Sequence, residues 1–275
     1  MPESGGAGQE KFERHRASSR RYGATALTTS RQLPQTLGYL AVLIPSVLLL
    51  QALLILMHEF THSTVAWLLN DMASPLDIVW GNPLMMTGWD EGVGYKALFA
   101  EGKLHQAAII GVSPLIMHGV FVSLCLAFML GKRLPKHKWL FHTVFWFCVA
   151  HLMELIAYIP MRGFSAHGDT GNFNQGMELS PWWLFIFGSL ALAVALYIFY
   201  RRALPRMFAL IAPNNPMLQW TILAASAFAL FFWGSGLRVM FYVYPDPQWA
   251  FGLLAFPAAA VVLYCFRPGK HSLVV

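Results

Sequence analysis

Six stretches of the chain are almost entirely apolar, and polar and charged residues collect between them. Each stretch is about 20 residues long or longer, which is the length that an α-helix needs to cross a hydrocarbon core about 30 Å thick. The pattern therefore predicts an all-α fold, a polytopic transmembrane helix bundle of about six spans. The expected spans are residues 38–69, 104–130, 139–160, 181–200, 217–243 and 248–266.

The composition excludes a water-soluble globular protein. Hydrophobic residues make up 57% of the chain and Asp, Glu, Lys and Arg only 12%, whereas charged residues account for about 25% of an ordinary soluble domain. The net charge of +6 comes from basic residues in short segments between the apolar stretches. We therefore expect the lipid bilayer as a partner, and no nucleic acid.

The pattern divides the chain into a tail and a membrane domain. Residues 1–35 contain several arginines and few large apolar residues, which predicts a disordered basic tail. Residues 36–270 form the expected transmembrane domain. The loop 71–103 mixes glycine and proline with apolar residues, so we expect a membrane-associated loop or a short β flap between the first two spans.

Charges in the loops predict the orientation of the chain. The tail, residues 132–138 and residues 201–206 are basic, whereas the loop 71–103 is acidic. Because basic loops stay on the cytoplasmic side, the N- and C-termini are expected in the cytoplasm and the loop 71–103 on the extracytoplasmic side. The prediction is a multi-pass protein of a bacterial inner (cell) membrane.

The motif His58-Glu59-Phe60-Thr61-His62 at the end of the first span carries the clearest chemistry. Residues i and i+4 of a helix share one face, so both imidazoles can bind one metal ion. Two imidazoles and a carboxylate suit Zn²⁺, with the fourth position left for a water molecule whose pKa falls to about 7. The motif predicts His58 and His62 as zinc ligands and Glu59 as the general base. The alternative is a set of polar side chains that hold helices together by hydrogen bonds.

A third zinc ligand is expected from the loop after the third span. Asp169 follows Gly168 there, and the glycine lets the backbone turn. In the predicted topology this loop and the end of the first span emerge on the same side of the membrane. His167 is a rival ligand, or it positions the substrate or the carboxylate, as Asn172 also could. The alternative is a polar turn with Asp169 in solvent.

The third span carries His151 and Glu154, three residues apart on one helix face. A carboxylate and a histidine inside a membrane indicate function by default, because burying them is costly. Three roles are open: positioning the zinc ligands, relaying protons or forming a second metal site together with His118 and His142. The alternative is a neutral, hydrogen-bonded Glu154 that faces another helix.

The motif and the later carboxylate resemble the site-2 protease class of intramembrane zinc metalloproteases. In that class, such a helix supplies two histidine ligands and a glutamate that acts as the base. His58, His62 and Glu59 match these residues fully. The class takes its third ligand from an aspartate two spans later. Asp169 matches it loosely, because Ala157 stands at the position of an asparagine and Gly168 precedes the aspartate rather than following it.

The resemblance covers roughly residues 50–175 and implies a zinc metalloprotease that cleaves membrane or membrane-proximal protein or peptide substrates. The class usually places its zinc near the cytoplasmic side, opposite to the side that the loop charges indicate here. Two other functions remain open. One is a membrane di-metal (iron) oxidase or hydroxylase, and the other is a non-enzymatic metal transporter or scaffold.

Overall fold

The computed structural model describes residues 6–82, 88–244 and 247–269, with side chains described from residue 32 onward except at positions 237, 242 and 247. These residues form helices joined by loops, and the strand-like feature among them is one isolated bridge. Six helical segments are long and apolar enough to cross a membrane, which confirms the predicted all-α polytopic bundle. They are Gln32–Leu68, Leu104–Leu130, Lys138–Tyr158, Pro181–Ile211, Pro216–Phe241 and Gln248–Cys265.

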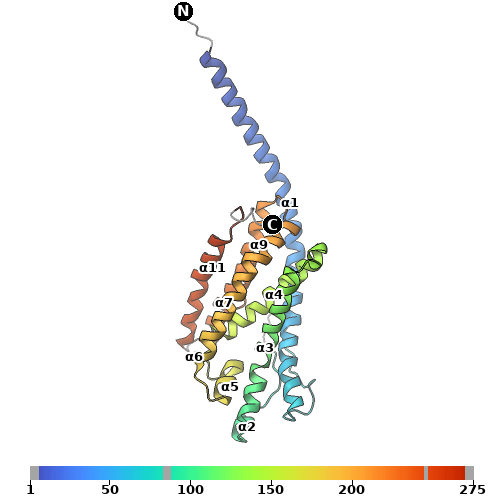
Figure 1. The fold of residues 1–275 in the computed structure, drawn as a ribbon, viewed down its shortest axis with the longest axis vertical. Coiled ribbons are helices and arrows are strands. Elements are labelled where there is room, and N and C mark those ends of the chain that lie inside the picture. Colours follow the sequence, from blue (N-terminus) through green and yellow to red (C-terminus); the bar gives the residue numbers. More distant parts are fainter. Residues whose placement is uncertain (1–5, 83–87, 245–246, 270–275) are drawn as a thin grey trace, which may run out of the picture.

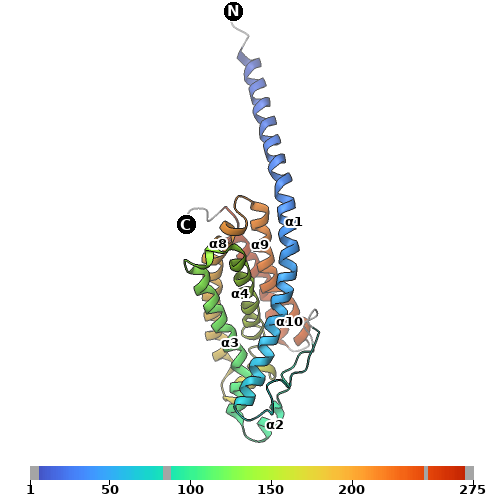
Figure 2. The same ribbon diagram turned by 90° about the vertical axis from the view of Figure 1, so that its right-hand side faces the viewer.

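The first span belongs to one long helix, α1 (Gly6–Leu68), which continues past the bundle at its N-terminal end (Figures 1 and 2). Pro34 and Pro45 both lie within the helix. At its other end α1 reaches the short helices α2 (Tyr95–Ala100) and α5 (Gly168–Gly176). The disorder expected for residues 1–35 stays a prediction.

The helices α3 (Leu104–Leu130) and α4 (Lys138–Tyr158) pack against α1 and against each other. Aromatic side chains fill the interior, and Trp146 is almost completely buried. Its indole Nε1 donates a hydrogen bond to the hydroxyl of Tyr39, 3.0 Å away, which connects α4 to α1. The short helix η1 (Leu134–Lys136) connects α3 to α4.

The C-terminal half supplies the remaining three spans. The fourth consists of α6 (Pro181–Trp183), η2 (Leu184–Gly188), α7 (Ser189–Ile198), η3 (Phe199–Ala203) and α8 (Leu204–Ile211). The fifth consists of α9 (Pro216–Phe228), η4 (Ala229–Trp233) and α10 (Gly236–Val243), and the sixth of η5 (Pro247–Leu254) and α11 (Ala255–Cys265).

The fifth span changes its helical geometry where it approaches α4. Its η4 segment is a π-helix, a wider turn that is often found near functional sites. A side chain at Gly234 would collide with Met153 of α4, so glycine permits the close approach of the two helices. The hydroxyl of Ser235 donates a hydrogen bond to the carbonyl of Leu230 at the break before α10.

The described part of the loop between the first two spans contains one isolated β-bridge and no strand, so the expected β flap is reduced to a single pair of residues. Val79 and Asp90 exchange two backbone hydrogen bonds of 2.9 and 3.2 Å in an antiparallel bridge. Residues 83–87 lie outside the described part of this loop. Lys103 and Asp71 form an ion pair of 3.0 Å that joins the two ends of the loop. The loop therefore stays close to the end of α1 that carries the histidine motif.

Candidate metal centre

The last turns of α1 place His58 and His62 on one buried face. Their side chains are 6% and 1% exposed, and their rings meet edge to face with centroids 5.0 Å apart. This is the arrangement that the i, i+4 spacing predicts.

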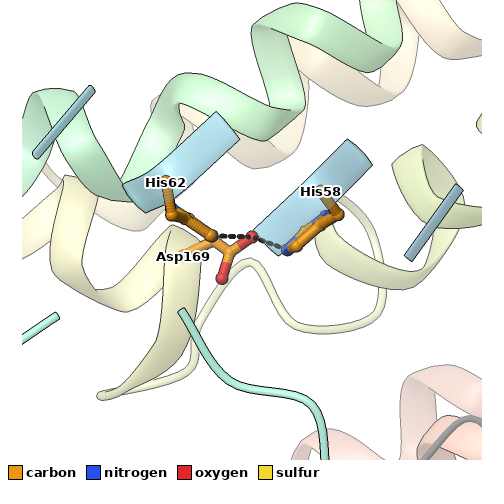
Figure 3. Close-up of side chains that lie close together, drawn as sticks. All are labelled: His58, His62 and Asp169. Atoms are coloured by element: carbon orange, nitrogen blue, oxygen red, sulfur yellow. Dashed lines mark ion pairs between the residues drawn. The ribbon is translucent and has the colours of Figure 1, made fainter. Parts of the chain in front are cut away.

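Asp169, in the first turn of α5, completes the group. Its Oδ2 atom lies 3.1 Å from Nε2 of His58 and 3.5 Å from Nε2 of His62, between the two imidazoles (Figure 3). In a tetrahedral zinc site with bonds of about 2.0–2.1 Å, ligand atoms lie about 3.3 Å apart. The three side chains offer ligand atoms within 4.8 Å of one another, so they could hold a metal ion.

Hydrogen bonds around the group define which atoms face one another. Nδ1 of His62 lies 2.8 Å from the carbonyl oxygen of Ile110. Because a carbonyl oxygen only accepts, Nδ1 must carry the proton, and a neutral His62 then turns the lone pair of Nε2 toward Asp169. The buried Oδ2 of Asp169 accepts no hydrogen bond from the described residues. A positive charge stabilises electron-rich atoms that face one another in a buried group, and a metal ion or protonated imidazoles can supply it.

The neighbours of Asp169 favour the ionised form of its carboxyl group. Burial by itself would raise the pKa of its carboxyl group, but the adjacent His62 and His58 imidazoles hold that pKa below its ordinary value. The expectation of a solvated aspartate in a polar turn is therefore not met, because the residue is buried.

Glycines let α5 bring Asp169 to this position. Gly168 turns the chain with a φ of +74°, a conformation that other residues rarely adopt. A Cβ atom on Gly111 of α3 would lie 3.0 Å from both the carbonyl oxygen of Asp169 and the Cβ of Asn172. The hydroxyl of Thr170 donates to the carbonyl of Arg162 at 2.8 Å and holds the start of α5.

A cavity of about 460 Å³ adjoins the group. His58 and Glu59 of α1 line it together with Glu154 of α4 and Val239 and Phe241 of α10. Since Glu59 and a histidine ligand face the same space, a water molecule there could contact a bound metal ion and the carboxylate together. This arrangement suits hydrolysis, in which a base takes a proton from attacking water.

Two tyrosines that the sequence did not single out contact His58 and His62. Tyr158 stacks on His58, with ring centroids 5.3 Å apart and planes 23° apart. The hydroxyl of Tyr95 lies 3.3 Å from Nδ1 of His62, and burial and the nearby Glu91 raise the pKa of Tyr95. A lone tyrosine carries no spacing signal, which is why the sequence did not reveal them.

The other predicted site residues lie around the group rather than in it. His167 is exposed and precedes α5, so the structure brings Asp169 and not His167 to the two imidazoles. Asn172 is buried beside Gly111. His151 contacts a histidine of α3, and Glu154 accepts a hydrogen bond of 3.1 Å from the amide of Gln51.

We expect Gly111→Ala to weaken metal binding, because the added methyl group pushes α5 and Asp169 away from the two histidines. Zinc affinity measured by competition with a chelator should fall about tenfold. This is the lower end of the loss seen when a residue that supports a metal ligand is substituted. Gly119→Ala on the same helix is the matched control, since a Cβ there meets no atom within 4 Å. Equal zinc affinity of the two variants would contradict this role of Gly111.

No protein-family model, curated protein or solved structure matches the chain. Within the described part of the chain, one group of three side chains has the geometry of a metal site, and it consists of His58, His62 and Asp169. The interpretation of this site therefore depends on its own geometry.

Proposed function

We propose that this protein is a membrane-embedded zinc metalloprotease that hydrolyses peptide bonds of membrane or membrane-proximal proteins. The observation that carries the proposal is the position of Glu59. Glu59 lines the same cavity as His58. His58 also belongs to the group of three possible metal ligands that His62 and Asp169 complete. A base beside an incompletely filled metal site is the arrangement that hydrolysis requires.

The nature of the ligands supports zinc. Two imidazoles and one carboxylate are the ligands of several catalytic zinc sites, with a fourth position left open. A zinc ion held by His58, His62 and Asp169 would lower the pKa of water and polarise the peptide carbonyl. The Glu59 carboxylate would then accept the proton of the attacking water and deliver it to the nitrogen of the departing amine, so that one peptide bond and one water give an acid and an amine.

The cavity also suits a peptide from within the membrane. Its wall combines apolar side chains, among them Ile55 of α1 and Val239 of α10, with polar groups such as Glu154. An extended peptide exposes both apolar side chains and unpaired backbone groups, which have to find partners in a membrane. The substrate we propose is therefore a membrane-anchored protein or peptide.

We also propose the orientation that the loop charges predict. In the views along two directions, the N- and C-terminal ends of the described chain lie toward one end of the bundle, and α2 and α5 toward the other (Figures 1 and 2). The basic residues of 132–138 follow α3 at the end opposite to the metal group. Cytoplasmic termini in a bacterial inner membrane would thus place the site on the extracytoplasmic side.

The two other functions find less support in the site. A di-metal iron oxidase needs a second set of ligands, and the described residues bring His118, His142, His151 and Glu154 into no such set. A non-enzymatic transporter or scaffold needs no general base at position 59. Substitution of Glu59 therefore distinguishes this function from that of a protease.

We expect Glu59→Gln to keep the metal and to abolish proteolysis. The amide preserves the size of the side chain but accepts no proton, so the cleavage rate should fall by about 10²–10⁴-fold. The measurement combines zinc content with cleavage of a library of fluorogenic membrane-anchored peptides in lipid vesicles. Glu101→Gln, in the exposed loop before α3, is the matched control and should cleave like the wild type. Undiminished cleavage by Glu59→Gln would contradict the proposal.

The proposed orientation predicts which loops an impermeant reagent reaches. In a Cys265→Ser background, which removes the exposed cysteine, Ala73→Cys should react with a membrane-impermeant maleimide in intact cells and Lys132→Cys should not. Both positions are exposed in the structure. The opposite labelling pattern would place the metal group on the cytoplasmic side, where the resembled class has it.

A further inference from the structure

A chain of three histidines leads from the metal group into the interior of the bundle. Nδ1 of His58 lies 3.1 Å from Nε2 of His118 in α3. Nδ1 of His118 lies 2.7 Å from Nδ1 of His151 in α4. His118 and His151 are both completely buried. These three histidines thus connect the transmembrane helices α1, α3 and α4 next to the metal group.

The distances define the direction of the hydrogen bonds once a metal ion is bound. Nε2 of His58 faces Asp169, so a metal ion takes the lone pair of this atom and the ring proton must reside on Nδ1. The Nδ1–H group of His58 donates a hydrogen bond to Nε2 of His118, so His118 must carry its own proton on Nδ1. The Nδ1–H group of His118 in turn donates a hydrogen bond to Nδ1 of His151. All three imidazoles are neutral in this arrangement.

The surroundings of the last histidine favour this neutral arrangement. The ring of His151 stacks on Phe121, with centroids 4.9 Å and planes 12° apart, and meets Phe147 edge to face at 4.3 Å. Its buried Nε2 atom has no hydrogen-bond partner among the described residues. An apolar enclosure disfavours a charged imidazole, so the surroundings favour a neutral His151, whose single proton lies on the enclosed Nε2 when Nδ1 accepts from His118.

We propose that His118 is a positioning residue for the metal centre, and that it orients His58 and selects the tautomer in which Nε2 binds the metal. The proposal rests on the proposed metal site. His62 receives the same support from the carbonyl of Ile110, so each histidine ligand has a partner on α3. Histidine ligands usually donate their second ring nitrogen to such a partner, which is commonly a carbonyl or a carboxylate. Here an imidazole supplied by α3 takes that place for His58.

The alternative is a structural role, in which buried histidines only hold three helices together. The two roles differ in what they require of residue 118. Positioning requires an acceptor for the proton of His58 at this place, whereas packing requires only a side chain of the right volume. Glutamine can accept from His58 with its amide oxygen and donate to His151 with its amide nitrogen, and leucine can do neither.

The test measures zinc affinity by chelator competition in the purified full-length protein. His118→Leu should raise the Kd for zinc about 10–100-fold, as loss of a ligand's partner does, and His118→Gln should stay close to the wild type. His142→Leu is the control, because this buried histidine of α4 lies among Tyr39, Trp139 and Trp146 rather than in the chain. The visible spectrum of bound Co²⁺ should change in His118→Leu only.

Two results would overturn the proposal: wild-type affinity in His118→Leu, or equal losses in His118→Leu, His118→Gln and His142→Leu. Melting temperatures of the same variants separate a general loss of packing from a loss confined to the metal. The proposed function fails separately. A wild-type protein that binds zinc but cleaves no peptide removes the protease and leaves the role of His118 intact, whereas a wild-type protein that binds no metal removes both.

Discussion

The structure depends on the burial of three electron-rich atoms against one another inside a membrane domain. Nε2 of His58 and Nε2 of His62 lie 3.1 and 3.5 Å from Oδ2 of Asp169, and all three side chains are buried. Such a cluster is stable only with a positive charge among its members. A metal ion provides that charge while each imidazole stays neutral, with a single proton on Nδ1. The packing of α1, α3 and α5 serves this one requirement, since each helix contributes a ligand or the partner of a ligand.

The later spans also contribute to the site. At the break after η4, Gly234 lies against Met153 of α4, and Val239 of α10 forms part of the cavity wall. The chain up to α5 therefore supplies the candidate ligands and the proposed base, and α10 of the fifth span adds part of the wall of the adjoining cavity. Irregular backbone at membrane depth is tolerated where protein or a cavity surrounds it.

The sequence predicted those parts of the site that periodicity and spacing determine. Six apolar stretches gave the spans, and the i, i+4 spacing of His58 and His62 gave a shared face. The choice between Asp169 and His167 remained open, because both lie in one short turn and only the packing of α5 buries one and exposes the other. Contacts between helices leave no periodic signal. The contact of His118 with His58 and the close approach at Gly111 therefore became visible only in the folded chain.

The proposed zinc site consists of His58, His62 and Asp169. Elemental analysis of the purified wild-type protein and of the Asp169→Ala and His62→Ala variants tests whether these three residues bind zinc. We expect about one zinc per wild-type chain, bound by two nitrogen ligands and a carboxylate at about 2.0–2.2 Å in X-ray absorption, and loss of most of the metal in both variants. Full zinc retention in Asp169→Ala would contradict the claim.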